Sequence, residues 1–312
     1  MAFTPACSVI IPTYNRAALL RRTLESLTRQ DIGVGAFEVL VVDDGSSDGT
    51  AEVVAGFEDR LRVRYFFQPD EGFRASAARN MGIAHAVSDV SVMLDCGVLA
   101  HSGCLRAHLR SHADERPAAV IGYVYCFNLS NEDAERMRET LDFDDVDGTI
   151  ARLRREGRWL DLREEFYARD PGPLRELPAP WPLYWTCDVS ARTAQLRDIG
   201  GFDETFTTWG AEDIDLSYRL HRDGAIFVLN RDASAIHYPH SKDWSHNSEL
   251  ALRNRRYVAE KYDTPITRLL AVEPMIRLFD LNDIIRREGL PSCREYLAEV
   301  GADRPGTTRT EG

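Results

Sequence analysis

The feature that most constrains the fold is an alternation of short apolar runs and helical patterns in the N-terminal third of the chain. Four runs rich in branched and aromatic residues have the length of buried strands, and Pro12 stops the first of them. These runs are residues 7–11, 37–42, 63–67 and 90–94, and helical patterns follow the first three at 17–30, from 50 onward and at 75–86. Strands that alternate with helices form a mostly parallel sheet covered on both faces, so we expect an α/β layered fold.

Polar residues stand where the predicted strands end. Pro12-Thr13-Tyr14-Asn15 follows the first strand, Asp43-Asp44 the second and Asp95 the fourth. In sheets of this class, ligands bind at the carboxyl ends of the strands. Dinucleotide-binding proteins carry G-x-G-x-x-G after the first strand, and neither this motif nor a Walker-type glycine-lysine loop occurs there. The sequence therefore predicts a ligand site at this edge and disfavours dehydrogenases and P-loop proteins.

Composition and charge narrow the classes of partner. The 312 residues are 44% hydrophobic and 28% charged, which is typical of a soluble globular protein. The formal net charge of -12 disfavours nucleic acid and anionic lipid as partners. No apolar run approaches the ~20 residues of a membrane span, and we expect a cytoplasmic protein without a transmembrane segment. The scattered cysteines favour buried free thiols over disulfides or a zinc cage.

The chain changes character after a strand predicted at 119–124. More than half of the residues from 131 to 170 are charged, which predicts helices on a solvated surface with little core of their own. Five prolines between 171 and 182 then mark an irregular loop. Further predicted elements are an extended segment at 184–191, helices at 193–199, 247–262, 273–288 and 292–300, and strands at 225–229 and 233–237.

An acidic stretch, Trp209-Gly210-Ala211-Glu212-Asp213-Ile214-Asp215, runs into a helical pattern in the second half of the chain. The glycine frees the backbone just before the helix, and Glu212 and Asp213 fall in the first turn, where the helix dipole favours anions. Such a helix start is ordinary by itself. A catalytic role therefore depends on the other polar residues that the fold brings near it.

Two groups of motifs resemble one enzyme family. Residues 11–16 (Ile-Pro-Thr-Tyr-Asn-Arg) and 41–48 (Val-Val-Asp-Asp-Gly-Ser-Ser-Asp), with Asn80, resemble the family 2 glycosyltransferases, which have the GT-A fold. Gly200-Gly201-Phe202-Asp203 and the acidic stretch are similar to the acceptor half shared by galactosyl- and N-acetylgalactosaminyltransferases and chondroitin-type polymerases. The resemblance covers residues 6 to 240 in outline and implies an enzyme that moves a sugar from a nucleotide-sugar donor.

The resemblance implies a donor site in the first half of the chain. In the family pattern Pro12, Tyr14 and Asp43 hold the nucleobase, with Tyr14 on the ring and the carboxylate accepting from uracil N3. An aromatic face with one acceptor suits uracil, so a UDP-sugar is the expected donor, and thymidine and guanosine donors stay open. Capping of the next helix is the alternative role of Asp43 and Asp44. The other implied donor-site residues are Thr13, Asn15, Arg74, Arg79, Asn80, Asp95 and Lys242. The two arginines are five positions apart, so at most one of them faces the ligand.

Asp95-Cys96-Gly97 stands where the family has its D-x-D motif, whose carboxylates hold the ribose and a divalent metal on the diphosphate. The first aspartate is present and the last is replaced by glycine. His237 resembles the histidine that completes the metal shell in galactosyltransferase-like relatives, and a core histidine is its alternative role. The resemblance thus implies Mn²⁺ or Mg²⁺ on Asp95 and His237. Lys242 is expected to clamp the diphosphate.

The resemblance assigns catalysis to the acidic stretch. Asp213 is the expected base of an inverting transfer, and Glu212 is expected to hydrogen-bond the donor sugar or the acceptor. The helix dipole lowers the pKa of Asp213 and burial raises it, and the sequence leaves the balance open. Trp209 is the expected platform for a sugar ring, with Trp185, Trp159 and Trp181 as further stacking surfaces.

Four sections follow from this reading. Residues 1–125 form the nucleotide-sugar-binding half and 126–183 a charged helical insertion with the proline-rich loop. Residues 184–245 form the acceptor-binding, catalytic half and 246–312 a helical extension with a disordered tail from Gly301. The insertion is either a lid or acceptor wall with Trp159, Trp181 and Trp185 as stacking surfaces, or a solvated helical hairpin in which these tryptophans belong to the core.

Several alternatives stay open. A nucleotidyltransferase would need a glycine-rich basic loop after the first strand, which is absent. A non-catalytic nucleotide-sugar-binding protein is compatible with Asp95-Cys96-Gly97 but not with the retained Glu212, Asp213 and His237. The acceptor is a saccharide, a peptide side chain or a small natural product. His108 and His112 have zinc-binding spacing but lack the intervening glutamate of a zinc protease, so we expect them at the surface.

Overall fold

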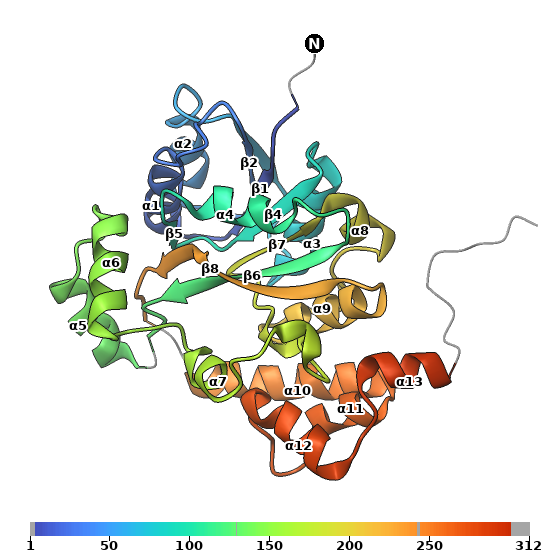
Figure 1. Ribbon diagram of the computed structural model, residues 1–312. Helices are drawn as coiled ribbons and strands as arrows, with labels where there is room; N and C mark the ends of the chain where they lie inside the picture. The colour runs from blue at the N-terminus through green and yellow to red at the C-terminus, as the bar shows by residue number, and fades with distance from the viewer. Residues whose placement is uncertain (1–3, 129, 242–243, 301–312) are drawn as a thin grey trace, which may run out of the picture.

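A computed structural model describes residues 4–128, 130–241 and 244–300, which form an eight-stranded sheet with helices on both faces (Figure 1). The strand order is β3-β2-β1-β4-β7-β6-β8-β5. The strands are β1 Ser8–Thr13, β2 Glu38–Asp43, β3 Val63–Phe67, β4 Val90–Leu94, β5 Val98–Ala100, β6 Ala118–Tyr125, β7 Asp188–Arg192 and β8 Ile226–His237. The first four pair in parallel, as do β6 and β8, whereas β7 and β5 run antiparallel to their neighbours. The predicted α/β class with its largely parallel sheet is confirmed.

Two apolar clusters cover opposite faces of the first strands, because side chains alternate along each strand. Val9 and Ile11 of β1 pack in the cluster that also holds the buried faces of α1 (Ala17–Leu27), α2 (Thr50–Ala55) and α4 (Cys104–Ser111). Ile10 packs in the larger cluster with α3 (Ala75–His85), α8 (Thr193–Asp198) and α9 (Glu212–Arg222). Strands β1, β2 and β4 are therefore buried on both sides, as their continuous apolar sequence indicates, whereas the edge strand β3 is largely exposed.

The charged insertion is helical, as predicted. It contains α5 (Asn131–Thr140), α6 (Val146–Glu156) and α7 (Glu164–Arg169), and Ser130 and Asp145 cap the first two. The buried side chains of these helices, among them Met137, Ile150 and Phe166, join the larger cluster of the main domain. The insertion therefore has no separate core, and its apolar stripe docks on the sheet layer.

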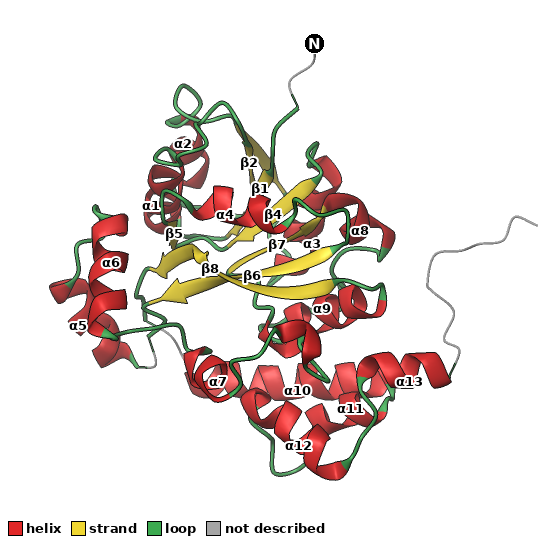
Figure 2. Ribbon diagram, viewed as in Figure 1, coloured by secondary structure: helices red, strands yellow, loops and turns green. Residues whose placement is uncertain are grey.

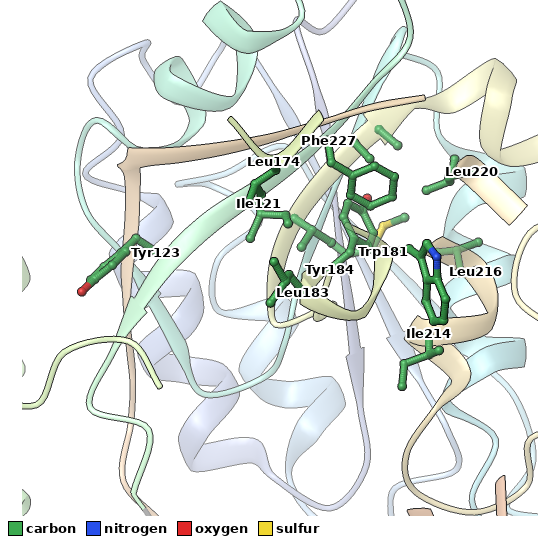
Figure 3. Packing of buried hydrophobic residues seen from close by; sticks show 14 of the residues in the cluster. Ile121, Tyr123, Leu174, Trp181, Leu183, Tyr184, Ile214, Leu216, Leu220 and Phe227 are labelled. Carbon is green, nitrogen blue, oxygen red and sulfur yellow. The ribbon is translucent and has the colours of Figure 1, made fainter. Parts of the chain in front are cut away.

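The proline-rich loop forms two short 3-10 helices, η1 (Leu174–Glu176) and η2 (Trp181–Leu183). Figure 3 shows the Trp181 ring between η2 and α9, beside Ile214 and Leu216. The ring is fully buried and meets the Tyr218 ring edge-on at a centroid distance of 5.3 Å. The prediction of Trp181 as a sugar-stacking surface is therefore wrong: it is a core side chain.

The last described elements form a helical layer, which lies below the sheet in the view of Figure 2. Its elements are α10 (Trp244–Tyr262), α11 (Pro265–Arg268), η3 (Leu269–Ala271), η4 (Leu278–Asp280), α12 (Leu281–Glu288) and α13 (Cys293–Glu299). The predicted helix at 273–288 is wrong in its first half, since α12 begins only at Leu281. The two strands predicted around residues 225–237 are one strand, β8, opposite a register shift between Ile121 and Tyr123 of β6. No helix among the described residues is long and apolar enough to cross a bilayer.

The expectation that His108 and His112 lie at the surface is wrong. His108 is fully buried and His112 is 4% exposed, because both face the sheet from α4. His108 Nε2 lies 2.9 Å from Asp188 Oδ1, and both imidazoles lie within 2.9 Å of Ser190 Oγ. Burial and the neighbouring His108 lower the pKa of His112 to about 3. The described cysteines are unpaired, in agreement with the prediction of free thiols.

Candidate active site

The carboxyl ends of β1, β2 and β4 lie side by side, as their parallel pairing requires. Thr13 at the end of β1 pairs with Asp43 at the end of β2, and Asp95 directly follows β4. Thr13 Oγ1 lies 3.5 Å from Cys96 Sγ. The strand-end residues expected from the sequence are therefore brought together at one edge.

The loop after β1 presents an open aromatic ring. Tyr14 is 44% exposed, and its hydroxyl donates to Asp70 Oδ2 over 2.8 Å, which raises the pKa of the phenol. Asn15 is in the left-handed region (φ 49°), and its Oδ1 accepts from the Ser47 amide at 2.8 Å. The loops after β1 and β2 thus hold each other, and Tyr14 offers a ring on which a flat base can pack.

Asp43 is buried at the carboxyl end of β2. It is 1% exposed; its Oδ1 accepts from the Ser46 amide at 2.8 Å and its Oδ2 from the Tyr65 hydroxyl at 2.6 Å. Helix α2 has no side-chain cap at its N-cap residue, Gly49, and the turn before it is held by Asp48, whose Oδ1 accepts from the Thr50 amide at 3.1 Å. Helix capping as the alternative role of Asp43 is therefore wrong, and its contact with a base stays a prediction.

Arg74 and Arg79 point to different places, as their spacing predicts. Arg74 pairs with Glu71 near the surface, whereas Arg79 is 5% exposed. Arg79 donates to Asp95 Oδ1 at 3.0 Å and to Glu212 Oε1 at 3.3 Å. Burial opposes the charge, but the two carboxylates raise the pKa of Arg79 above its ordinary value. This arginine therefore links the donor-side aspartate to the acidic stretch of the second half.

Helix α9 begins with an abrupt turn of the backbone. Gly210 (φ 97°) and Ala211 (φ 71°) are both left-handed, and Glu212 starts the helix. Glu212 is 7% exposed, and among the described residues its Oε2 has no hydrogen-bond partner. Burial and the neighbouring Glu212 raise the pKa of Asp213 to about 7. Burial therefore outweighs the opposing effects of Arg79 and of the hydrogen bond from the Ile214 amide, and the pKa of Asp213 lies well above that of an ordinary aspartate.

The third carboxylate of the stretch has a structural role. Asp215 is fully buried and accepts from Arg219 (2.6 Å), Lys261 (2.6 Å) and the Tyr262 hydroxyl (2.7 Å). Lys261 also reaches Asp203 Oδ2 at 2.7 Å. This network ties α9 to α10 and to the turn that contains Asp203.

His237 ends β8, and Asp95 lies in the turn between β4 and β5, the strand that pairs with β8. Val98, three residues after Asp95, pairs with His237 across the β5–β8 ladder, and the Gly97 carbonyl accepts from the Tyr238 amide at 2.8 Å. The Asp95 side chain is 36% exposed. A carboxylate oxygen and an imidazole nitrogen at one strand edge form a donor set that suits a divalent cation such as Mn²⁺. That Asp95 and His237 share a metal ion stays a prediction.

Another group of possible ligand atoms lies in Cys104, His108 and Asp188, whose atoms are within 4.8 Å of one another. All three side chains are fully buried under α4. Both imidazole nitrogens of His108 are already bonded, to Asp188 and to Ser190. This cluster stabilises the contact between α4 and β7 and lies apart from Arg79 and its carboxylates.

The two tryptophans proposed as acceptor platforms differ in exposure. Trp209 is 41% exposed on the loop before α9. Trp185 is half-buried, with its ring stacked on Phe279 at a centroid distance of 6.0 Å and its Nε1 donating to the Pro182 carbonyl at 3.1 Å. Trp159 is half-buried under Arg158. Trp209 is the most open of these rings, and the acceptor roles stay predictions.

One predicted donor residue has another role in the structure. Asn80 Nδ2 donates to the Phe202 carbonyl at 2.9 Å and to Glu204 Oε1 at 2.8 Å, while its Oδ1 accepts from the Phe202 amide at 2.6 Å. The asparagine therefore holds the Gly200–Asp203 turn, and its contact with the donor stays a prediction. Lys242 lies outside the described residues.

Sequence reasoning missed the residues that support these groups from other elements. Tyr65 and Asp70 bond Asp43 and Tyr14 from β3 and the loop after it, and Asn254 of α10 donates to the Gly210 carbonyl at 2.8 Å. None of them belongs to a local motif. The Asn254 contact spans 44 positions of sequence, which no periodicity reveals.

The comparisons with known proteins agree with this geometry. The family described as "Glycosyl transferase family 2" matches residues 8–170, more than half of the chain. The chain belongs to glycosyl transferase family 2. A second family, described as "N-terminal domain of galactosyltransferase", matches residues 174–240. The expected family and enzyme class are thereby confirmed.

Among curated relatives of this family 2 chain, the validoxylamine A glucosyltransferase of Streptomyces hygroscopicus subsp. jinggangensis is 42% identical over 257 residues. The match covers 81% of this chain and 60% of the relative. The chondroitin synthase of Escherichia coli is 31% identical over 74% of this chain and 34% of its own length. The chain thus spans three fifths or less of the length of these relatives.

Solved structures confirm the GT-A fold. The mannosyltransferase of Pyrobaculum calidifontis, solved with GDP-Man and Mn²⁺, has a TM-score of 0.56 and 20% identity, and the match covers 92% of this chain and 70% of that one. The S. aureus protein TarS (residues 1–349) with UDP-GlcNAc has a TM-score of 0.53 and 17% identity over 86% of this chain and 70% of that one. At these identities the likeness shows the fold alone.

Proposed function

We propose that this protein transfers a sugar, with inversion, from a UDP-sugar to a hydroxyl of a saccharide or small natural product. The observation that carries the proposal is that Arg79 hydrogen-bonds both Asp95 and Glu212, next to Asp213, whose pKa is raised to about 7. This bridge brings donor-side and acceptor-side groups into one site. Family membership supports sugar transfer, and the likeness to a validoxylamine A glucosyltransferase supports glucose as the sugar.

The donor would lie over the ends of β1, β2 and β4. Tyr14 would pack on the base and Asp43 would accept from it, with Pro12, Thr13 and Asn15 lining the same loop. Asp95 and His237 would hold Mn²⁺ or Mg²⁺, which would neutralise charge on the departing diphosphate. A nucleotide in this place leaves the sugar facing Glu212 and Asp213.

Asp213 would act as the general base. A base works best when its pKa lies near the operating pH, and a value of about 7 meets this condition. The acceptor oxygen would attack the anomeric carbon as its proton passes to Asp213, and the bond to the diphosphate would break on the opposite face. The unpartnered Glu212 Oε2 would accept from a sugar hydroxyl, and Trp209 would support the ring.

The variant Asp213→Asn tests this assignment because it keeps the shape and removes the base. With UDP-glucose and validoxylamine A as probes, we expect UDP release to fall by about 10²–10⁴-fold. UDP affinity, measured by calorimetry with Mn²⁺, should stay unchanged. Asp232→Asn, at an exposed position of β8, is the matched control and should keep full activity. Full activity of Asp213→Asn would overturn the assignment.

A binding panel tests the donor separately. We expect UDP with Mn²⁺ to raise the melting temperature more than GDP or TDP, and Tyr14→Ala to remove the shift. A larger shift with GDP would refute the uracil assignment and favour a guanosine donor. UDP binding without sugar transfer to any acceptor in a mass-spectrometric screen would instead favour a nucleotide-sugar-binding protein.

A further inference from the structure

Helix α10 lies beyond both matched stretches, 8–170 and 174–240, yet it holds the backbone that leads into the acidic stretch. Asn254 of α10 is 7% exposed. Its Nδ2 lies 3.2, 3.3 and 2.8 Å from three successive backbone carbonyls, those of Thr208, Trp209 and Gly210. One side-chain amide therefore hydrogen-bonds three successive carbonyls of the loop immediately before Glu212.

The loop needs this support because its backbone is unusual. Ala211 has a left-handed φ of 71°, which a residue with a Cβ adopts only where its surroundings impose it. Gly210, with φ 97°, lies so close to α10 that an added Cβ would be 3.0 Å from Ala251 Cβ. Ala251 of α10 therefore packs closely against Gly210, and Asn254 of the same helix donates to the carbonyls of the turn.

The same helix also holds α9 from a second side. Lys261 and Tyr262 bond the buried Asp215, and Tyr257 donates to Asp203 Oδ2 at 2.8 Å. The body of α9 is thereby anchored through Asp215. The direction in which Glu212 and Asp213 leave the turn then depends on the Asn254 contacts at Thr208, Trp209 and Gly210.

We propose that Asn254 is a positioning residue for the reaction, which holds the left-handed turn at Gly210 and Ala211 so that Glu212 and Asp213 face the donor sugar. This inference rests on the proposed role of Asp213. It makes α10 part of the catalytic half instead of an appended extension.

The variant Asn254→Ala tests the proposal by removing the donors from all three carbonyls. We expect kcat to fall at least tenfold, while the KM for the UDP-sugar and the UDP affinity change less than twofold, because the donor loops are untouched. Gly210→Ala, which adds a methyl group against Ala251, should produce the same split. A crystal structure of either variant should show Ala211 outside the left-handed region.

Asn230→Ala is the matched control. Asn230 also donates its amide to a backbone carbonyl, that of Ala107 at 2.9 Å, but on the α4 face of the sheet. A structural role alone predicts that activity follows the melting temperature in both variants. A kcat of Asn254→Ala within twofold of the parent, or an equal loss in Asn230→Ala, would overturn the proposal.

Different results would refute the role of Asp213 as the base and the positioning role of Asn254. If Asp213→Asn is active, the proposed base is wrong and the Asn254 result carries no catalytic meaning beyond the loop structure. If Asp213→Asn is inactive while Asn254→Ala keeps its kcat and its turn, the base stands and the positioning role is wrong.

Discussion

The buried bridge at Arg79 makes a quantitative prediction about stability. The side chains of Arg79 and Glu212 are 6% and 9% exposed, so Arg79→Met would leave Glu212 as a buried charge without its partner. Removal of one partner from a buried pair costs about 3–5 kcal/mol. Asp95 is 36% exposed and can regain water, so we expect the lower end of this range, about 3 kcal/mol of unfolding free energy.

Urea unfolding near pH 7.5, followed by circular dichroism, measures this loss. Arg60→Met is the control, because Arg60 makes a two-bond pair with Glu25 (2.8 and 2.9 Å) while both side chains are well exposed. Such surface pairs are worth about 0–1 kcal/mol. Adding Glu212→Gln to Arg79→Met removes the orphaned charge and should restore stability, giving a coupling of about 1–3 kcal/mol. A loss in Arg79→Met no larger than in Arg60→Met would refute the reasoning.

Three further outcomes follow from the site. The kcat/KM should fall about tenfold per pH unit below about pH 7, where Asp213 gains its proton, and a profile that is flat from pH 5 to 8 would contradict this. Because the pKa of Asp213 is raised in the folded state, its protonated form stabilises the fold at acid pH, and this contribution is lost as the pH rises through 7. In urea titrations Asp213→Asn should therefore be more stable than the parent at pH 8 and equally stable near pH 3. His237→Ala should weaken Mn²⁺ binding at least tenfold by calorimetry, whereas His85→Ala should leave it unchanged.

The first half of the fold is predictable from sequence because its strands are short runs rich in apolar residues and a helix follows each of β1, β2 and β3. The second half of the fold is less predictable, because some of its strands lack a clear sequence pattern. β5 has only three residues, too few for a pattern, and the polar residues Asn230, Arg231 and Asp232 in the middle of β8 imitate a turn. His108 was misplaced because its partners Asp188 and Ser190 lie on β7, about 80 positions away in sequence.

The site shows the same division. Residues at strand ends, such as Tyr14, Asp43 and Asp95, are predictable because the topology of a parallel sheet collects them. Roles that depend on a partner far away in the sequence are not predictable in this way. Asp215 stands in the same acidic turn as Asp213 and differs because Arg219 of α9, and Lys261 and Tyr262 of α10, bond its carboxylate.

The glycine in Asp95-Cys96-Gly97 can be explained by the backbone at this point. Gly97 has a φ of 96°, where any side chain is strained, and its amide donates to Thr23 Oγ1 at 2.9 Å. Its carbonyl accepts from the Tyr238 amide, which helps to keep the neighbouring His237 opposite Val98. A carboxylate at position 97 would strain the turn that leads into β5, the strand that pairs with His237. The missing aspartate therefore has a local structural reason, and metal binding by Asp95 and His237 stays a prediction.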